Sequence, residues 1–365
     1  MKKIVQGLGA ALLVLVAYLL LWPIPIQPVS LPVPAQPGYV GVHAVNTKLA
    51  NLQMIDLQGE VGPEHIAFGP DGKLYTTVVS GNILRMNADG SGQEVFANTG
   101  GRVLGFDFDA QGNLIAADSF KGLLAIAPDR KVTVLTDAVN GDPIRYADGV
   151  VVAPDGKMYL SDASMRFAPK DWGGTFESSV LDILEQAATG RIIEYDPATK
   201  VTRVVAKGLS FANGVALSQD GKHLFVNETG RYRVWKMDVS AKDLDVKQPN
   251  PQATVFLDNL PGYPDNLMRG LDGKIWLGFA KPRNPVADKL MDKPFLREVT
   301  MRLPRALWPV PKSYGHVVAF TEDGKIVADL QDPTGAYPET TAITETKDRL
   351  YVHSLHAHGL GWLAK

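Results

Sequence analysis

A short pattern of polar and hydrophobic positions recurs along the chain. GPDGKLYTT (Gly69–Thr77) returns as DAQGNLIAA, APDGKMYLS, SQDGKHLFV and GLDGKIWLG, and more weakly as ETKDRLYVH. In each copy a turn dipeptide is followed by apolar or aromatic residues. This order predicts a tight hairpin turn leading into a β-strand.

The spacing of these copies indicates how the strands are grouped. Steps of 40, 44, 65, 52 and 76 residues separate the equivalent turn positions, which are Asp71, Gln111, Asp155, Asp220, Asp272 and Asp348. A step of about 40–50 residues is what one four-stranded propeller blade requires. The pattern predicts an all-β fold, a six-bladed β-propeller. We expect residues 40–57 to supply a strand that closes the ring of blades.

Two of the steps are long because they contain insertions. Residues 166–189 include FESSVLDILEQAAT, whose apolar spacing is helical, and residues 282–312 hold another helical stretch. We therefore expect two helical loop insertions. They either cover one mouth of the central tunnel or decorate the surface.

The N-terminus has a different pattern. Lys2 and Lys3 precede an apolar run from Ile4 to Trp22. About 19 helical residues at ~1.5 Å each just span a hydrocarbon core of ~30 Å. We predict a transmembrane signal anchor over 1–22, with the rest of the chain outside the cytoplasm. A cleaved signal peptide is the alternative, although no small-x-small site follows.

The next residues are rich in proline. We expect 23–39 to be an extended linker that lifts a propeller of residues 40–365 off the membrane.

One position of the repeat carries polar residues where an apolar strand begins. Seven residues before each turn position stand Glu64, Leu104, Asp148, Asn213, Asp265 and Thr341, which we call the ring. The first strand of each propeller blade lines the channel, so these positions should face one another. Carboxylates that converge without a cation repel one another. Hard oxygen ligands in a wide ring favour Ca²⁺. A solvated tunnel without metal is the alternative.

A second set of acidic residues lies seven or eight positions after three of the turns. Asp118, Asp162 and Glu228 either support the metal ligands or form cross-strand hydrogen bonds within the blades.

Composition excludes several classes of function. The chain has no cysteine, which rules out disulfides, thiolate zinc sites and a cysteine nucleophile. Its net charge of −2 gives no basic face for nucleic acid. No GxSxG, HExxH or P-loop motif is present.

Glu339 and His356 are the candidate proton carriers if they lie near the tunnel mouth.

Two segments carry a resemblance to a known family. FANGVALSQDGKHLFVNETGRYRVWKMDV and LPGYPDNLMRGLDGKIWLG resemble the strictosidine synthase-like proteins, a family that includes adipocyte plasma-membrane-associated protein. The likeness runs from about Val61 to the C-terminus. More distantly the chain is similar to gluconolactonase, regucalcin, paraoxonases and diisopropylfluorophosphatase, which are calcium propellers.

The resemblance implies particular site residues. Calcium ligands fall on Glu64, Asn213 and Asp265, on Asp148 by the repeat register, and on Asn266 by similarity to paraoxonases. Leu104 stands where paraoxonases place a histidine implicated in catalysis. Glu339 aligns with the glutamate that strictosidine synthase uses for its condensation.

These observations favour a membrane-anchored, calcium-dependent hydrolase of lactones or esters, similar to an arylesterase. Water would attack a metal-polarised carbonyl of a small-molecule substrate, activated by Asp265, Glu339 or His356. A non-catalytic calcium-stabilised binding propeller and a strictosidine synthase-like condensing enzyme are the alternatives.

Overall fold

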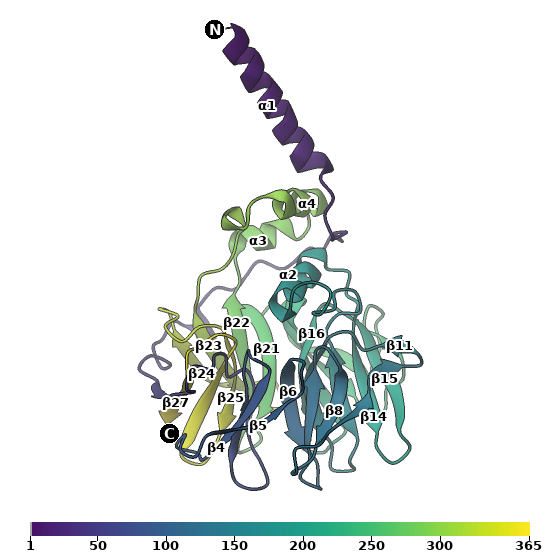
Figure 1. Cartoon of the computed structure of the whole chain (residues 1–365), viewed down its shortest axis with the longest axis vertical. Coiled ribbons are helices and arrows are strands. Elements are labelled where there is room, and N and C mark those ends of the chain that lie inside the picture. The colour runs from purple at the N-terminus through teal and green to yellow at the C-terminus, as the bar shows by residue number, and fades with distance from the viewer. Residues whose placement is uncertain (1) are drawn as a thin grey trace.

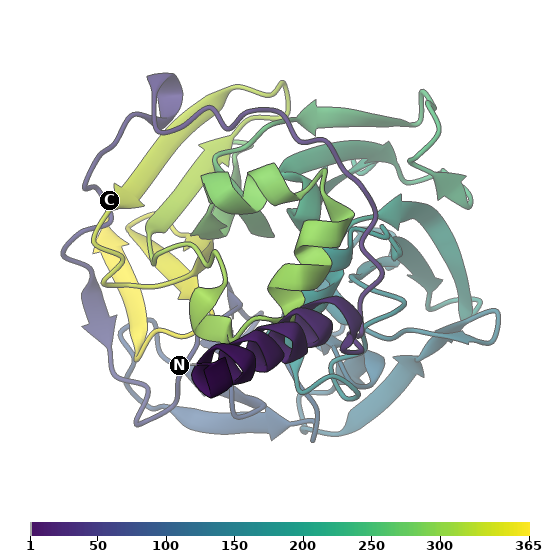
Figure 2. The same cartoon turned by 90° about the horizontal axis from the view of Figure 1, so that it is seen from above.

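The computed structural model describes residues 2–365, and within them six antiparallel sheets surround a central axis (Figures 1 and 2). Each sheet has four strands, except that the third gains a fifth, short parallel strand. The six-bladed β-propeller expected from the repeat is confirmed.

The first three blades follow the chain in order, except for the short strand β19. Blade one is β2 (Ile66–Phe68), β3 (Leu74–Thr77), β4 (Asn82–Met86) and β5 (Glu94–Asn98). Blade two is β6 (Val103–Phe108), β7 (Leu114–Asp118), β8 (Gly122–Ile126) and β9 (Val132–Thr136). A short hairpin of β10 (Ala138–Val139) and β11 (Asp142–Pro143) connects blade two to blade three. Blade three is β12 (Ala147–Val152), β13 (Met158–Asp162), β14 (Gly190–Asp196), β15 (Val201–Leu209) and β19 (Leu244–Asp245).

The other three blades complete the circle. Blade four is β16 (Ala212–Leu217), β17 (His223–Glu228), β18 (Arg233–Asp238) and β20 (Ala253–Leu257). Blade five is β21 (Gly262–Arg269), β22 (Ile275–Pro282), β23 (Gly315–Phe320) and β24 (Ile326–Asp332). Blade six is β25 (Thr340–Glu345), β26 (Arg349–Ser354), β27 (Leu360–Ala364) and β1 (Gln53–Ile55).

The closure of the ring is the one expected. The N-terminal strand β1 pairs antiparallel with the C-terminal strand β27, with Met54 opposite Gly361. The first and last parts of the domain therefore share blade six, so opening the ring requires this sheet to separate.

The repeated turn has a local cause. The side chain of Asp71 accepts a hydrogen bond from the amide of Lys73 at 3.1 Å, and Gly72 between them has a φ of 72°. Asp155 and Asp220 make the same bond two residues on. An Asx turn followed by a left-handed glycine is a favoured way to join two antiparallel strands.

The hydrophobic core lies between blades. Phe225 of β17 and Phe320 of β23 are fully buried in one cluster, with their ring centroids 6.0 Å apart. Similar clusters fill the other blade junctions. Truncation of such a side chain to alanine costs about 3–5 kcal/mol.

The second set of acidic residues forms cross-strand hydrogen bonds. Asp162 accepts a bond from the amide of Tyr146 at 2.9 Å, and Glu228 accepts one from Ser210 at 2.8 Å. Asp118 accepts from the amide of Arg102. Each carboxylate sits at the end of the second strand of its blade and holds the segment that enters the inner strand. These residues fix where the ring positions begin.

Both insertions are helical. The first contains α2 (Thr175–Glu185), and the second contains α3 (Pro285–Leu290), α4 (Pro294–Arg302) and the 3₁₀ turn η3 (Arg305–Leu307). Two further 3₁₀ turns are η1 (Gly41–His43) and η2 (Thr229–Arg231). We call α2, α3, α4 and η3 the cap, because they lie together at one end of the propeller (Figures 1 and 2).

The N-terminal helix α1 (Lys2–Leu21) projects beyond the cap (Figure 1). It is long and apolar enough to cross a membrane, with a mean hydropathy of 2.4 and none of that stretch buried.

The proline-rich segment after α1 differs from the expected spacer. It forms no helix or strand, but it lies against the protein surface instead of leading away from it. Ile26 is buried in a cluster with Phe167 and Leu181, and the guanidinium of Arg283 donates to the Pro34 carbonyl at 2.7 Å. Proline leaves carbonyl acceptors without matching donors, and arginines of the two insertions satisfy some of these acceptors. The domain boundaries stay a prediction.

Candidate functional site

The ring positions coincide with irregularities in the inner strands. The pairing of the first two strands shifts register at Leu104, Asp148, Asn213, Asp265 and Thr341. Glu64 lies two residues before the start of β2. A bulge re-aims side chains that a regular strand would direct alternately to its two faces. The bulges explain how oxygen-bearing side chains can point along the channel in the middle of apolar strands.

A glycine follows three of the ring positions and permits close packing of the inner strands. A Cβ on Gly214 would lie 2.6 Å from the carbonyl oxygen of Asp265, and one on Gly105 would lie 2.7 Å from that of Asp148. Any side chain at these positions would force neighbouring blades apart. The dipeptides Asp148-Gly149 and Asn213-Gly214 are therefore a local sign of the ring.

Four of the expected ligands line one cavity of about 300 Å³. They are Glu64, Asp148, Asn213 and Asp265, and each is buried. The fifth, Asn266, lines a second cavity of about 230 Å³, and its side-chain amide donates to the Glu64 carbonyl at 3.2 Å. The bulge at Asp265 thus places the side chains of Asp265 and Asn266 in different cavities, on opposite sides of the ring.

Ionisation of the buried carboxylates of the ring is electrostatically unfavourable. Burial raises the pKa of Asp148 well above its usual range, and the carboxylates of Asp265 and Glu64 raise it further. Burial and Glu64 likewise raise the pKa of Asp265. Burial also raises the pKa of Glu64, although Arg102 opposes this. The shifts of Asp148 and Asp265 arise because these carboxylates are desolvated beside other carboxylates, whereas that of Glu64 arises from burial alone.

The donor set fits a hard divalent cation. Oδ1 of Asn213 is buried and, among the described residues, has no hydrogen-bond partner. Three carboxylates and an orphaned amide oxygen are ligands that calcium prefers. The guanidinium of Arg102, paired with Glu64, offsets one of the three negative charges. Two remain, which is the charge that a divalent cation neutralises.

Arg102 was missed by the sequence analysis. It belongs to the segment that enters β6, bonds to both Glu64 and the Val78 carbonyl, and lines the cavity. It stands two residues before Leu104, the apolar ring position of blade two. A lone arginine beside the one aliphatic ring position was the available signal.

Glu339 and His356 form a hydrogen-bonded pair at the mouth of the same cavity. Oε2 of Glu339 contacts Nδ1 of His356, and Nζ of Lys281 lies 2.6 Å from Oε1. Burial opposes ionisation of Glu339, but the bonds from His356 and Lys281 lower its pKa to about 2. The bond to Glu339 raises the pKa of His356, and Glu64 adds to this rise.

The upper wall of the cavity is largely apolar and comes from the cap. It includes side chains of both insertions: Phe176, Val180, Ile183, Ala287, Trp308 and Val310. The ring of Phe176 lies 6.3 Å from that of His356. The insertions therefore form the roof of the cavity, as one of the two alternatives had it.

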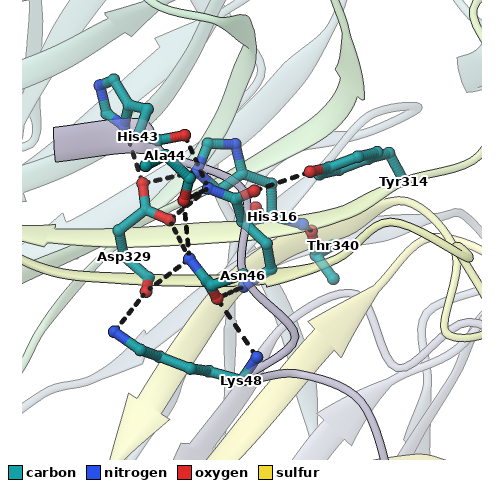
Figure 3. Close-up of polar contacts among 9 residues, drawn as sticks. His43, Ala44, Asn46, Lys48, Tyr314, His316, Asp329 and Thr340 are labelled. Carbon is teal, nitrogen blue, oxygen red and sulfur yellow. Dashed lines mark hydrogen bonds and ion pairs between the residues drawn. The ribbon is translucent and has the colours of Figure 1, made fainter. Parts of the chain in front are cut away.

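A separate polar cluster lies outside the channel, where η1 meets blade five (Figure 3). Oδ2 of Asp329 is 2.8 Å from Nδ1 of His43 and 3.0 Å from Nε2 of His316. These three residues are close enough to share a metal ion. Asn46 and Gln331 donate to Oδ1 of Asp329, so both oxygens already accept hydrogen bonds. We interpret the cluster as a clasp for the N-terminal segment.

Comparison with known proteins shows to which family the chain belongs. A family model for strictosidine synthase matches residues 148–242, and one for the strictosidine synthase-like N-terminal region matches 41–86. Protein STRICTOSIDINE SYNTHASE-LIKE 6 of Arabidopsis thaliana is 34% identical over 81% of this chain and 77% of its own length. The chain belongs to the strictosidine synthase-like family.

Other relatives and solved structures agree. Adipocyte plasma membrane-associated protein of Salmo salar is 30% identical, over 90% of this chain and 81% of that one. A gluconolactonase of Xanthomonas campestris superposes with a TM-score of 0.62 at 16% identity, over 93% of this chain and 97% of that one. Regucalcin of Agrobacterium tumefaciens gives 0.58 at 16%, over 85% and 92%. At such low identity these two structures show the fold alone, which this strictosidine synthase-like protein shares.

Proposed function

We propose that this strictosidine synthase-like protein is a calcium-dependent hydrolase of esters or lactones. Its fold also supports lactone hydrolysis elsewhere, since a gluconolactonase shares it. The proposal rests on one observation above all. The acidic ring and the Glu339–His356 pair open into the same cavity.

Glu64, Asp148, Asn213 and Asp265 would hold the cation, because all four are buried and line the same cavity, and only Glu64 among the three carboxylates is paired with a cationic side chain. Calcium bound there would supply a Lewis acid for a substrate carbonyl. Asp265, an expected catalytic residue, is assigned here as a ligand because it lines the same cavity as Glu64, whose charge raises its pKa.

His356 would take the proton of the attacking water. Its Nδ1 is held by Glu339, which leaves Nε2 as the atom that can accept a proton. Glu339 keeps the imidazole of His356 oriented and stabilises the imidazolium that forms, as a carboxylate does for histidine in other hydrolytic sites. Lys281 holds the second oxygen of Glu339 and prevents the carboxylate from turning away.

The substrate is expected to carry an apolar group. Aromatic and aliphatic side chains of the cap enclose the space above the ring, and such walls bind aryl or alkyl groups by excluding water. A small ester or lactone could place its carbonyl at the ring and its apolar part under the cap.

The condensing reaction of strictosidine synthase is the second candidate, favoured by the family model over residues 148–242. It would require Glu339 to exchange a proton with substrate. With its pKa lowered to about 2 and both oxygens engaged, Glu339 is poorly suited to that task. The structure therefore favours His356 as the proton carrier.

We also propose that the chain is anchored by α1, with the propeller outside the cytoplasm. The paired residues Lys2 and Lys3 before the apolar helix support this orientation. The relatives named for their association with the adipocyte plasma membrane are consistent with it.

The test is turnover of a panel of aryl esters and lactones by the full chain, in calcium and in chelator. We expect hydrolysis that chelator abolishes, that His356→Gln reduces at least a hundredfold, and that Glu339→Gln reduces less. Activity indifferent to chelator, or a fully active His356→Gln, would refute the proposal. Loss of hydrolysis in Glu339→Gln alone would make Glu339 the proton carrier in place of His356.

A further inference from the structure

The membrane end of α1 is attached directly to the cap. Nε of Arg302 in α4 donates to the carbonyl of Trp22 at 2.7 Å, and Arg166, the first residue of the insertion that contains α2, donates to the carbonyl of Pro25 at 3.2 Å. Because the segment after α1 packs on the cap, no free linker separates them. The C-terminal end of α1 and the cap therefore lie at the same height along the direction of α1.

Aromatic residues mark that level. Tyr18 and Trp22 lie at the end of α1 with their rings 5.5 Å apart. Tyrosine and tryptophan concentrate where a membrane-spanning helix leaves the hydrocarbon core. If α1 spans a bilayer, α4 lies among the lipid headgroups.

The cap exposes large apolar side chains that packing within the protein does not explain. Leu307 is 65% exposed and Phe295 is 56% exposed, and the same stretch exposes Val286, Leu296 and Val310. Residues 285–312 also carry six basic and three acidic side chains; Arg297 and Arg302 are buried, but four basic side chains and only one acidic side chain are exposed. Apolar groups interspersed with excess positive charge are typical of surfaces that insert into anionic lipid interfaces.

The exposed surface is continuous with the cavity. Val310 is 56% exposed and Phe176 is 41% exposed, and both also line the cavity above the ring. Figure 2 shows α3 and α4, in light green, on the same face of the propeller as α1. A molecule dissolved in the membrane could pass between these side chains without crossing water.

We propose that the cap is seated in the interfacial layer of the bilayer that α1 spans, with Phe295 and Leu307 inserted among anionic lipids. The cavity then opens at the membrane surface. Resting on the proposed hydrolase function, the substrate class is an ester or lactone with a long alkyl chain, taken from the bilayer.

The absence of native cysteine allows a direct test. Single cysteines at Phe295, at Leu307, at Leu12 within α1 and at Lys222 carry an environment-sensitive fluorophore. Lys222 is exposed in the turn between β16 and β17, at the rim away from the ring. The full chain is reconstituted into vesicles of phosphatidylcholine and phosphatidylserine with or without doxyl-labelled lipids.

We expect doxyl lipids to quench the labels at 12, 295 and 307 severalfold more than the label at 222. Quenching at 12 without quenching at 295 and 307 would overturn the proposal, since α1 would then span while the cap stayed in water. Labels at 295 and 307 shielded from water but unquenched by lipid would assign the surface to a second copy or a protein partner, and would also overturn it. An unquenched label at 12 would refute the spanning helix on which it depends.

The substrate class has its own readout. The variant Phe295→Ser/Leu307→Ser alters neither the ring nor the cavity wall. We expect it to keep wild-type turnover of a short, soluble ester and to lose at least fivefold on a long-chain ester in vesicles. Equal losses on both would contradict the substrate class. Absence of all hydrolysis in the wild type would refute both the proposed function and the substrate class derived from it, whereas the quenching result would still decide the membrane seat.

Discussion

The guanidinium of Arg102 is paired with the carboxylate of Glu64 at the level of the ring, beside the one aliphatic ring residue, Leu104. Both partners are almost completely buried. The pair leaves the ring with two unbalanced negative charges in place of three. It thus sets the charge that a bound cation must neutralise.

Removing this arginine should increase the dependence on calcium. Arg102→Met leaves Glu64 buried without a partner, and we expect the calcium-free chain to lose ~3 kcal/mol of unfolding free energy. Calcium should then raise the melting temperature more in the variant than in the wild type. The matched control is Arg85→Met, because Arg85 pairs with Glu94 on the exposed surface and should matter little. An identical calcium response in wild type and Arg102→Met would contradict the assigned role.

Neutralising Asp148 should have the opposite effect. Its pKa is raised by burial and by the carboxylates of Asp265 and Glu64, so the folded state binds its proton more tightly than the unfolded state does. Without metal, this group therefore destabilises the fold as pH rises from about 4 toward its folded-state pKa. We expect Asp148→Asn to melt higher than the wild type in chelator at pH 7.5, and to gain less from calcium. A lower melting temperature in chelator would count against the repulsive ring.

The pH dependence of turnover should report His356. The bond from Glu339 raises its pKa, so the neutral imidazole that accepts a proton prevails only at a pH above the usual value of about 6.5. Activity should rise as the pH passes through the raised pKa of His356. The ion pair of His356 with Glu339 stabilises the fold at lower pH, and this stabilisation is lost over the same pH range. Glu339→Gln should shift the rise in a kcat/KM profile to lower pH. An unshifted profile would mean that another group is the base.

The close approach of inner strands at the ring predicts a graded response to alanine. A Cβ on Gly214 would meet the backbone of Asp265 at 2.6 Å, whereas one on Gly149 would lie 3.1 Å from Asn213. We expect Gly214→Ala to cost about 1–3 kcal/mol in urea unfolding, and Gly149→Ala to cost less. Equal costs would show that the blades yield more easily than this packing suggests.

Much of the fold could be predicted because its signal is local. The Asx turn at Asp71 and its repeats needs only three consecutive residues, so the number of blades follows from counting. The helical insertions follow from their apolar spacing in the same way. The packed course of residues 23–37 could not be foreseen, because it depends on long-range partners such as Arg283 and Arg297.

The site was predictable in part for the same reason. Repeat register alone brings Glu64, Asp148, Asn213 and Asp265 to one cavity. It does not reveal the bulge that leaves Asn266 on the other side of the ring, nor Arg102, which lies outside the register. The pairing of Glu339 with His356 joins two loops whose conformations no periodic pattern specifies.

Calcium binding by the ring can be tested by diffraction from crystals of the full chain grown in the presence of calcium. We expect one anomalous peak within about 2.3–2.6 Å of oxygen atoms of Glu64, Asp148, Asn213 and Asp265. A ring without a peak would contradict calcium binding there.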